Sequence, residues 1–230
     1  MRAGQNRPGR KRPIWVFPAI SGVAALVGVF ALLAALDARG PGASEATASG
    51  SGAPVRVSGR ADVGGPFELV KHTGETVTEQ DFRGRPMLVY FGFTYCPDIC
   101  PMSLQILDAA LAELPEEDAA RFQTVLISVD PERDTPEALA QYVDTPAFPD
   151  GLVGLTGTPE QIRAAADAYR VYYARIEDDR STAGYTMDHT NVIYLMDSEG
   201  ELVDVFTHGA APDVIAARLK RFLEEGGANS

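Results

Sequence analysis

The feature that most constrains the fold is an apolar run that ends at two cysteines. The run MLVYFGF, Met87 to Phe93, carries no charge, and such runs are typical of a strand covered on both faces of an α/β sheet. The next segment, YCPDICP, contains Cys96 and Cys100, each followed by a proline. Proline is tolerated in the first turn of a helix but not in its interior. The sequence therefore predicts a strand, two thiols and a helix that begins within residues 98–101.

Later segments predict alternating helices and strands. The run VLISV, residues 125–129, predicts a second buried strand. Two Thr-Pro pairs predict helix starts at Thr135 and Thr158, and Gln161 completes the pattern of a capping box with Thr158. The helix after the cysteines is predicted to be amphipathic, with Met102 in the core, because leucines recur at intervals of three and four: Leu104, Leu107, Leu111 and Leu114.

Hairpins complete the predicted order. Residues 65–82 predict a hairpin that turns at His72 to Gly74, and residues 171–189 predict an inserted hairpin or loop around the acidic segment EDDRSTAG. The runs NVIYLMD and ELVDVF predict a terminal hairpin. A last helix should end at Gly226 and Gly227 and bury Val214, Ile215, Leu219 and Phe222. This order predicts a thioredoxin-like α/β fold, with a mixed sheet flanked by helices.

The amino-terminal region predicts a membrane anchor. Residues 14–36 contain no charge and are long enough to cross a hydrocarbon core of roughly 30 Å. Basic residues precede this span and Asp37 follows it, so the positive-inside rule places the amino terminus in the cytoplasm. The alternative is a cleaved signal peptide, but its apolar region would be shorter and the site Leu36-Asp37-Ala38 is poor.

These patterns divide the chain into four predicted parts. Residues 1–13 form a basic cytoplasmic segment, residues 14–36 the transmembrane anchor, residues 37–58 a flexible linker rich in Gly and Ser, and residues 59–226 the thioredoxin-like domain. Thirteen residues before the span leave no room for a mitochondrial presequence. We therefore expect a single-pass protein of a bacterial inner membrane, with its carboxy-terminal domain in the periplasm.

Charge and cysteine content exclude two broad classes. The formal net charge is -12 although the first thirteen residues are basic, which argues against a nucleic-acid binder that relies on phosphate contacts. The chain has only two cysteines, and they lie within five residues of each other. They therefore form a site and not a disulfide framework.

The predicted site favours a soft metal. A helix amino terminus stabilises thiolates, and two thiolates with an imidazole suit copper. Structural zinc usually has four protein ligands. Of the three histidines, His72 lies in a predicted turn and His208 at a strand end, whereas His189 precedes a strand in the segment MDHTN. In thioredoxin-like folds this loop lies beside the cysteines, and redox enzymes place a cis-proline there.

Three motifs carry a resemblance to a known family. The segments FGFTYCPDICP, SVDPERDTP and MDHTNVIYLMDSEGELVDVF resemble the SCO/SenC family of copper chaperones for cytochrome c oxidase, over roughly residues 60–225. The resemblance implies that Cys96, Cys100 and His189 bind copper, as Cu(I), Cu(II) or both. It also implies a role in assembling the dinuclear copper centre of oxidase subunit II, with other periplasmic copper chaperones as further partners.

Several alternatives stay open at this point. The main one is a dedicated thiol-disulfide reductase of the same partner, so whether the chain is an enzyme is undecided. A structural disulfide, a peroxidase and a redox sensor are weaker alternatives. Asp98 and Asp188 border the site and are candidates for tuning it, although each is equally explained as a turn or capping acid. Met187 carries a soft sulfur next to the site, but packing is its expected role.

Overall fold

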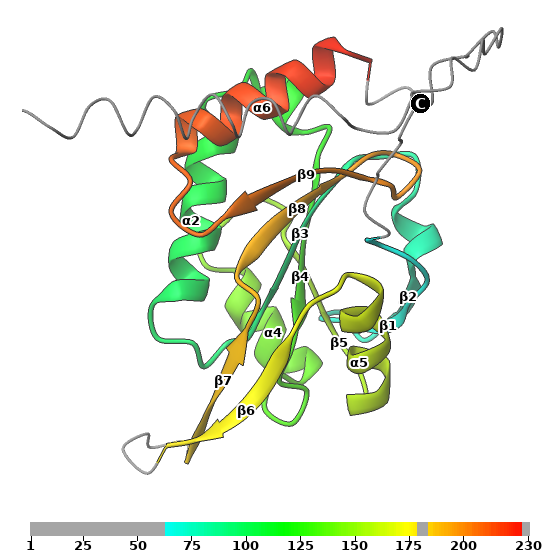
Figure 1. Cartoon of the computed structure of the whole chain (residues 1–230), viewed down its shortest axis with the longest axis vertical. Helices are drawn as coiled ribbons and strands as arrows, with labels where there is room; N and C mark the ends of the chain where they lie inside the picture. The colour runs from blue at the N-terminus through cyan, green and yellow to red at the C-terminus, as the bar shows by residue number, and fades with distance from the viewer. Residues whose placement is uncertain (1–62, 179–183, 227–230) are drawn as a thin grey trace, which may run out of the picture. The chain divides into compact units, whose positions relative to one another are not determined.

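A mixed β-sheet forms the centre of the structure, a computed structural model that describes residues 63–178 and 184–226 (Figure 1). Its strand order is β2-β1-β5-β4-β3-β8-β9. The strands of this sheet are β1 (Glu68–Lys71), β2 (Thr76–Thr78), β3 (Met87–Gly92), β4 (Gln123–Ser128), β5 (Val153–Thr156), β8 (Val192–Met196) and β9 (Leu202–Thr207). The predicted thioredoxin-like mixed sheet is confirmed.

The sheet has a parallel half and an antiparallel half that share β3. Strands β3, β4 and β5 are parallel, with Tyr90 opposite Leu126. On the other side of β3, β8 and β9 run antiparallel, and Tyr90 is paired with Ile193. The predicted amino-terminal hairpin is β1–β2, which joins the sheet through β5. Strand β3 is therefore central, and all six of its residues are buried.

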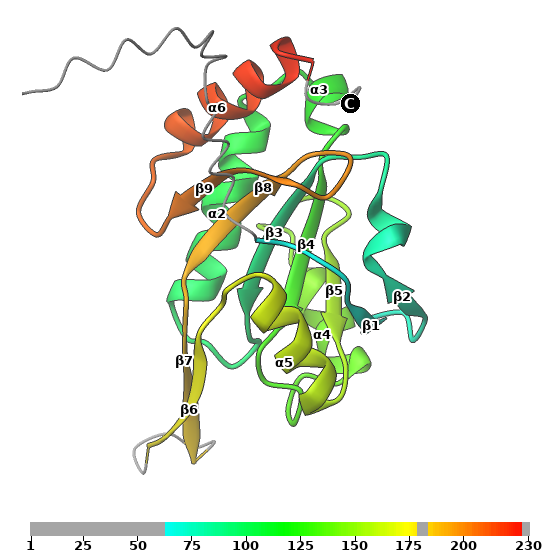
Figure 2. The same ribbon diagram turned by 45° about the vertical axis from the view of Figure 1, so that its right-hand side comes forward.

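Helices cover both faces of the sheet (Figures 1 and 2). Helices α2 and α6 pack together on one face, where Tyr90 of β3 also points, because its hydroxyl and the hydroxyl of Ser103 in α2 both contact the side chain of Asn191. The next side chain, Phe91, points to the opposite face and contacts Tyr169 at the end of α5. The helices are α2 (Ile99–Ala112), α3 (Glu116–Ala119), α4 (Pro136–Val143), α5 (Pro159–Ala168), α6 (Pro212–Glu224) and the 3-10 helix η1 (Glu79–Phe82).

The predicted helix starts follow capping chemistry. The side chain of Thr135 accepts a hydrogen bond from the amide of Ala138 at 3.3 Å, and Thr158 forms the predicted capping box with Gln161. Helix α2 begins at Ile99 with Asp98 as its N-cap residue, within the predicted range. The cysteines therefore lie at the amino-terminal end of α2.

A separate two-stranded sheet projects from the domain (Figure 2). It consists of β6 (Tyr173–Glu177) and β7 (Tyr185–His189), which are antiparallel and pair Tyr173 with His189. This is the predicted inserted hairpin. Because Tyr173 and His189 are at the end of the hairpin nearest to β8, His189 lies at its base.

Some packing predictions are wrong. Met102 and Val214 are 44% and 53% exposed, although both were expected in the core. The core-facing sides of α2 and α6 are filled by other residues, including Leu104 and Leu219. Met102 and Val214 lie on other sides of these helices and therefore face solvent. The sequence reasoning also missed β5, a four-residue strand interrupted by Gly154, and the one-turn helix α3.

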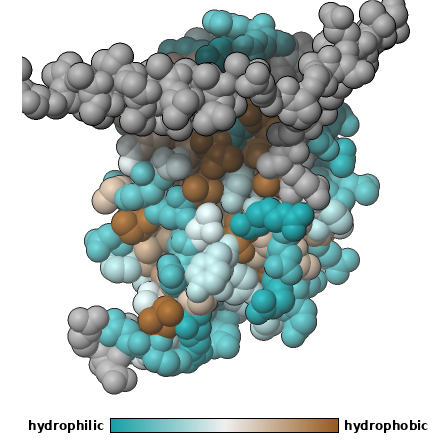
Figure 3. All heavy atoms as spheres, viewed as in Figure 1, coloured by the Kyte–Doolittle hydropathy of each residue, from teal (hydrophilic) through white to brown (hydrophobic). Residues whose placement is uncertain are grey.

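The predicted membrane span, residues 14–36, and the predicted linker both lie outside the described residues. Among the helices of residues 63–178 and 184–226, none has the length and apolar character needed to cross a bilayer. The coloured residues in Figure 3 include both polar and apolar side chains. The anchor therefore stays a prediction.

Candidate metal centre

The two cysteines lie where β3 leads into α2. The backbone amide of Cys96 donates to the carbonyl of Phe93 at 3.3 Å, which turns the chain sharply after the strand. Cys100 lies in the first turn of α2, and its amide donates to the sulfur of Cys96 at 3.3 Å. The first amides of a helix lack intrahelical partners and favour negative charge nearby. The sulfur of Cys96 thus occupies a position that stabilises a thiolate.

The two thiols differ in environment. Both are free, Cys96 is half-buried and Cys100 is buried. A hydrogen bond from the Cys100 side chain, together with amide donors, lowers the pKa of Cys96 to about 6 against the opposing effect of burial. The same interaction and burial raise the pKa of Cys100 far above its usual value. The two shifts have opposite directions, so Cys96 is the thiol that loses its proton more readily.

His189 presents one ring nitrogen to the cysteines. Its Nδ1 lies 3.0 Å from the carbonyl oxygen of Thr190, which can only accept, so Nδ1 carries the proton. Its Nε2 lies 3.5 Å from the sulfur of Cys100. Tyr90 and Phe93 flank the imidazole edge-on, with ring centroids at 6.2 and 5.9 Å. The fold therefore orients the imidazole through Nδ1 and directs Nε2 at the buried sulfur.

The Cys100–His189 pair fits a shared metal ion. Bonds of roughly 2.3 Å to sulfur and 2.0 Å to nitrogen, as zinc sites show, span a sulfur–nitrogen separation of 3.5 Å at an angle of about 109°. Over the two described ranges, however, no three His, Cys, Asp or Glu side chains already surround one point. Cys100 and His189 are therefore already placed to share an ion, and the adjacent Cys96 is the candidate third ligand.

A cluster of polar side chains lies beside Cys100. Tyr90 is fully buried beside Cys100, and burial raises the pKa of its hydroxyl well above the usual value. The same hydroxyl lies 3.0 Å from the side-chain amide of Asn191, which also lies 3.3 Å from the hydroxyl of Ser103. Sequence reasoning missed these residues, since Tyr90 belongs to an apolar run and Ser103 to a helix. The only available signal was the polar Asn191 directly before a buried strand.

The DPERDTP segment anchors the cysteine loop. Asp134 is fully buried and accepts three hydrogen bonds: from the amide of Thr94 at 3.0 Å, from its hydroxyl at 2.6 Å and from the hydroxyl of Ser128 at 2.6 Å. Thr94 is two residues before Cys96. The exit of β4 therefore fixes the loop that carries the half-buried thiol.

The same segment contacts the β6–β7 hairpin. Arg133 forms an ion pair with Asp130 and donates to the carbonyl of Tyr185 at 3.0 Å. Its guanidinium stacks on the ring of Tyr185 at 3.7 Å and lies 4.6 Å from the ring of Tyr95. Tyr185 is in the strand that ends at His189, and Tyr95 precedes Cys96. Arg133 thus links both halves of the candidate site.

The other candidate residues do not join the site. His72 lies in the turn after β1, where its Nδ1 accepts a hydrogen bond from the amide of Gly154 at 3.1 Å. His208 is exposed in the turn after β9, and Asp98 and Asp188 are exposed. Met187 is half-buried and packs against the core, as expected.

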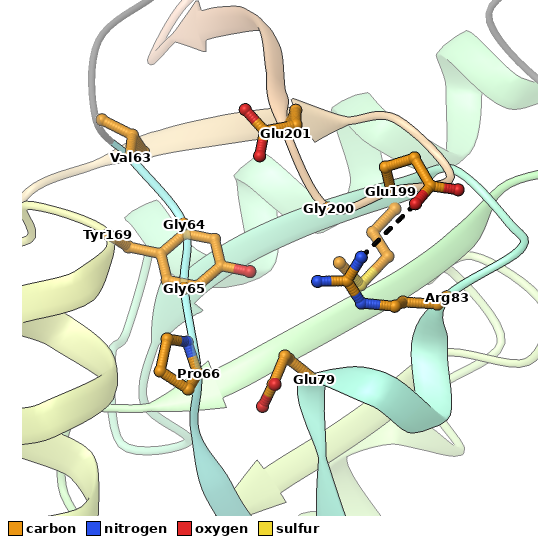
Figure 4. A pocket seen from close by; sticks show the side chains of 11 residues that line it. Val63, Gly64, Gly65, Pro66, Glu79, Arg83, Tyr169, Glu199, Gly200 and Glu201 are labelled. Carbon is orange, nitrogen blue, oxygen red and sulfur yellow. Dashed lines mark ion pairs between the residues drawn. The ribbon is translucent and has the colours of Figure 1, made fainter. Parts of the chain in front are cut away.

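A pocket of about 240 Å³ lies away from the cysteines (Figure 4). Its lining includes Met87, Tyr169 and the ion pair of Arg83 with Glu199, but no cysteine or histidine. Met87 begins β3, and the cysteines follow the end of that strand, roughly 20 Å away at 3.3 Å per residue. This pocket is therefore separate from the candidate metal centre.

Comparisons with known proteins agree with the motifs. The family model described as SCO1/SenC matches residues 55–224. Protein SenC of Rhodobacter capsulatus is 42% identical over 168 residues, which cover 73% of this chain and 73% of that protein. The human mitochondrial SCO1 homolog is 44% identical over 162 residues, 70% of this chain and 53% of that protein. For the mitochondrial SCO1 homolog 1 of Arabidopsis thaliana, the match spans only 43% of its length.

Solved structures of similar proteins agree with the family match. The copper-bound structure of Arabidopsis thaliana ScoI is 40% identical, with a TM-score of 0.66, over 71% of this chain and 99% of that chain. The copper-bound structure of Bradyrhizobium japonicum ScoI is 41% identical, with a TM-score of 0.62, over 70% and 99%.

Proposed function

The chain belongs to the SCO1/SenC family, and from this premise we propose that it binds copper through Cys96, Cys100 and His189. The observation that carries the proposal is the 3.5 Å separation between Nε2 of His189 and the sulfur of Cys100. Two similar proteins, from Arabidopsis and Bradyrhizobium, have been solved with copper bound. Copper is the cargo of such a site.

The donor set suits copper in either oxidation state. Soft thiolates favour Cu(I), and imidazole also suits copper. The lowered pKa of Cys96 favours its thiolate, whereas Cys100 must lose its proton when the ion binds. Cys100 and His189, which the fold holds 3.5 Å apart, bind the ion between them. A rotation of the half-buried Cys96 side chain brings its sulfur to the ion as the third ligand. Partial exposure of Cys96 leaves one ligand accessible for exchange with an acceptor.

The biological role we propose is copper delivery during cytochrome c oxidase assembly. The acceptor is the dinuclear copper site of subunit II, and other periplasmic copper chaperones supply the ion. Exposed apolar side chains surround the cysteines, with Tyr95, Ile99 and Met102 exposed by 58%, 36% and 44%, which suits docking of a protein partner. The uncharged span at residues 14–36 supports anchoring in a bacterial inner membrane, with this domain in the periplasm.

Copper titration of the reduced full chain, purified in a mild detergent, tests the site. We expect one copper per chain and sulfur-to-copper charge-transfer bands that are lost in Cys96→Ser and Cys100→Ser. His189→Ala should weaken binding at least tenfold, because it removes one of three ligands. His208→Ala is the matched control, since His208 is exposed and outside the site. Wild-type affinity in His189→Ala would refute the three-ligand set.

A reductase role is the second candidate, and the division of labour between the thiols favours it. Cys96 is half-buried with a pKa of about 6, as an attacking thiolate requires. Its sulfur would attack a partner disulfide, form a mixed disulfide and release one partner thiolate. The Cys100 thiolate, after losing its proton, would then attack Cys96, form the internal disulfide and release the second partner thiol. The partner gains two electrons and this chain loses two.

Trapping distinguishes the two roles. Cys100→Ser cannot resolve a mixed disulfide, so a reductase should accumulate a covalent adduct with oxidised subunit II through Cys96. Cys96→Ser is the control and should form no such adduct. If Cys100→Ser gives no adduct while wild type loads reduced subunit II with copper, the reductase role is refuted.

A further inference from the structure

The pocket of about 240 Å³ shown in Figure 4 has a buried hydroxyl at its floor. Tyr169 is only 2% exposed, and its ring packs against Tyr194 and Phe91, with centroids 5.7 and 5.4 Å away. These contacts hold the ring so that its hydroxyl points into the pocket (Figure 4). Within the part of the chain that the structure describes, this hydroxyl has no hydrogen-bond partner, which is rare for a buried polar group. The pocket therefore offers a ligand an unsatisfied polar group.

Two carboxylates near this hydroxyl lack a cation. In the view of Figure 4 the Tyr169 hydroxyl lies between the side chains of Glu79 and Glu201, which both line the pocket. Burial, and after it the negative charge of Glu79, raises the pKa of the Tyr169 hydroxyl, which agrees with their proximity. Among the described residues neither Glu79 nor Glu201 forms an ion pair, whereas Glu199 at the rim pairs with Arg83 at 3.5 Å. The lining thus has two more acidic than basic side chains.

Hydrogen bonds between distant segments fix the walls of the pocket. The amide of Phe67 donates to one oxygen of Glu79 at 3.0 Å, which positions this carboxylate and leaves its other oxygen for a ligand. The amide of Gly64 donates to the carbonyl of Ala168 at 3.0 Å, which holds the opposite wall next to Tyr169. The pocket is therefore preformed. Its volume is below the roughly 300–1,000 Å³ of sites for drug-sized molecules, so it suits a group the size of a side chain.

The arrangement of the acceptors indicates the chemistry of the ligand. No three His, Cys, Asp or Glu side chains of the described residues surround one point, so the carboxylates do not form a ready-made metal site. A guanidinium is planar and has five N–H donors that point in several directions, which suits a phenolic oxygen and two carboxylates on separate walls. The buried side chain of Met87 adds an apolar wall against which an alkyl stem can pack.

We propose that this pocket binds an alkylguanidinium group, such as an arginine side chain, whose N–H groups donate to the hydroxyl of Tyr169 and to the carboxylates of Glu79 and Glu201. The site is separate from the cysteines and does not depend on the proposed function. One source of the group is this chain itself, because Arg60 lies three residues before Val63, a lining residue, and three residues span at most about 11 Å. The other source is a separate molecule.

The test is a titration of the copper-free full chain, in a mild detergent, with N-acetylarginine amide. Binding is followed by nuclear magnetic resonance through the ring signals of Tyr169. N-acetylcitrulline amide is the matched ligand, because it has the same length but a neutral urea in place of the guanidinium. It should bind about tenfold more weakly, since charge-assisted hydrogen bonds are roughly twice as strong as neutral ones.

Conservative variants test the residues of the pocket. Glu79→Gln keeps an oxygen for the amide of Phe67 but loses the charge, so it should weaken binding of the arginine amide about fivefold or more. Glu75→Gln is the matched control, because Glu75 is exposed in the turn between β1 and β2 and outside the pocket, and it should leave the affinity unchanged. Tyr169→Phe, followed through the methyl signal of Met87, should weaken binding about threefold, because one hydrogen bond is lost. Equal effects of Glu79→Gln and Glu75→Gln overturn the proposal.

The double variant Arg56→Gln, Arg60→Gln distinguishes the two sources. Binding by wild type supports a separate molecule as the source, and binding by the double variant alone supports an arginine of the same chain. If neither protein binds, or if the arginine and citrulline amides bind equally, the proposal is overturned. The comparison of ligands needs no pocket variant, so it stands where a variant fails to fold. Because no copper is present, failure here leaves the copper proposal standing, and failure to bind copper leaves this one standing.

Discussion

Replacement of Asp134 by alanine should destabilise the domain and loosen the cysteine loop. The carboxylate is fully buried and accepts three hydrogen bonds from Thr94 and Ser128. At about 1–1.5 kcal/mol each, these bonds contribute about 3–4.5 kcal/mol. Removal of a buried charge offsets part of this, so we expect Asp134→Ala to lower the free energy of unfolding by about 3 kcal/mol.

Asp134→Asn is the matched variant. Its oxygen can accept from the amide of Thr94 and from Ser128, and its nitrogen can donate to the Thr94 hydroxyl, which then rotates. We therefore expect a loss of at most about 1 kcal/mol, the size of one lost hydrogen bond. Comparing Asp134→Ala with Asp134→Asn therefore separates the effect of the three hydrogen bonds on stability from the effect of the charge.

The charge adds a dependence on pH. Burial raises the pKa of Asp134 above its usual value, so the folded state binds the proton more tightly than the unfolded state does. The stability from this group is complete below the unfolded pKa and is lost as pH rises through the folded pKa. The free energy of unfolding of Asp134→Asn, relative to wild type, should therefore be higher at pH 7 than at pH 3.5.

Urea unfolding of the full chain, followed by far-UV circular dichroism at both pH values, measures these differences. If Asp134→Ala lies within 1 kcal/mol of wild type, or if both variants lose the same amount, the three contacts do not have the importance assigned to them. An unchanged difference between Asp134→Asn and wild type from pH 3.5 to 7 would refute the pH argument.

Three further predictions concern separate parts of the domain. Alkylation of the reduced protein by iodoacetamide should reach half its maximal rate near pH 6, because the pKa of Cys96 is lowered. Mass spectrometry should find Cys96 modified before Cys100. A midpoint near pH 9 would contradict the lowered pKa. Gly92→Ala should cost about 1–3 kcal/mol in urea unfolding, because the new carbon crowds Tyr90 and Cys100; no loss would show that the site adapts. Thr158→Ala should cost about 1 kcal/mol and leave copper binding unchanged, and an altered copper titration would contradict the separation of α5 from the site.

Much of the fold could be predicted from local patterns. The apolar run Met87 to Phe93 indicated a buried strand, and the Thr158–Gln161 capping box indicated the start of α5. Strand β5 was missed, because four residues that include Gly154 carry too short a pattern to stand out. Met102 was misplaced because hydrophobicity alone does not determine which face of a helix a residue occupies.

The candidate site was only partly predictable. The proximity of His189 to Cys100 followed from the topology of the fold, because the loop before β8 lies beside the end of β3. The interactions of Tyr90 and Asp134 did not, because they depend on tertiary contacts between residues 40 to 101 positions apart. A buried tyrosine and a loop aspartate have the same sequence signature whether or not they support a functional side chain.

The contact between Cys100 and His189 also ties the candidate metal centre to folding order. The two residues are 89 positions apart, so their meeting closes a long loop whose entropic cost must be offset by strand pairing. That pairing is the one between β8 and β3. A chain that has not yet paired these strands offers two thiols but no adjacent imidazole. The proposed three-ligand set can therefore form only after β8 has paired with β3.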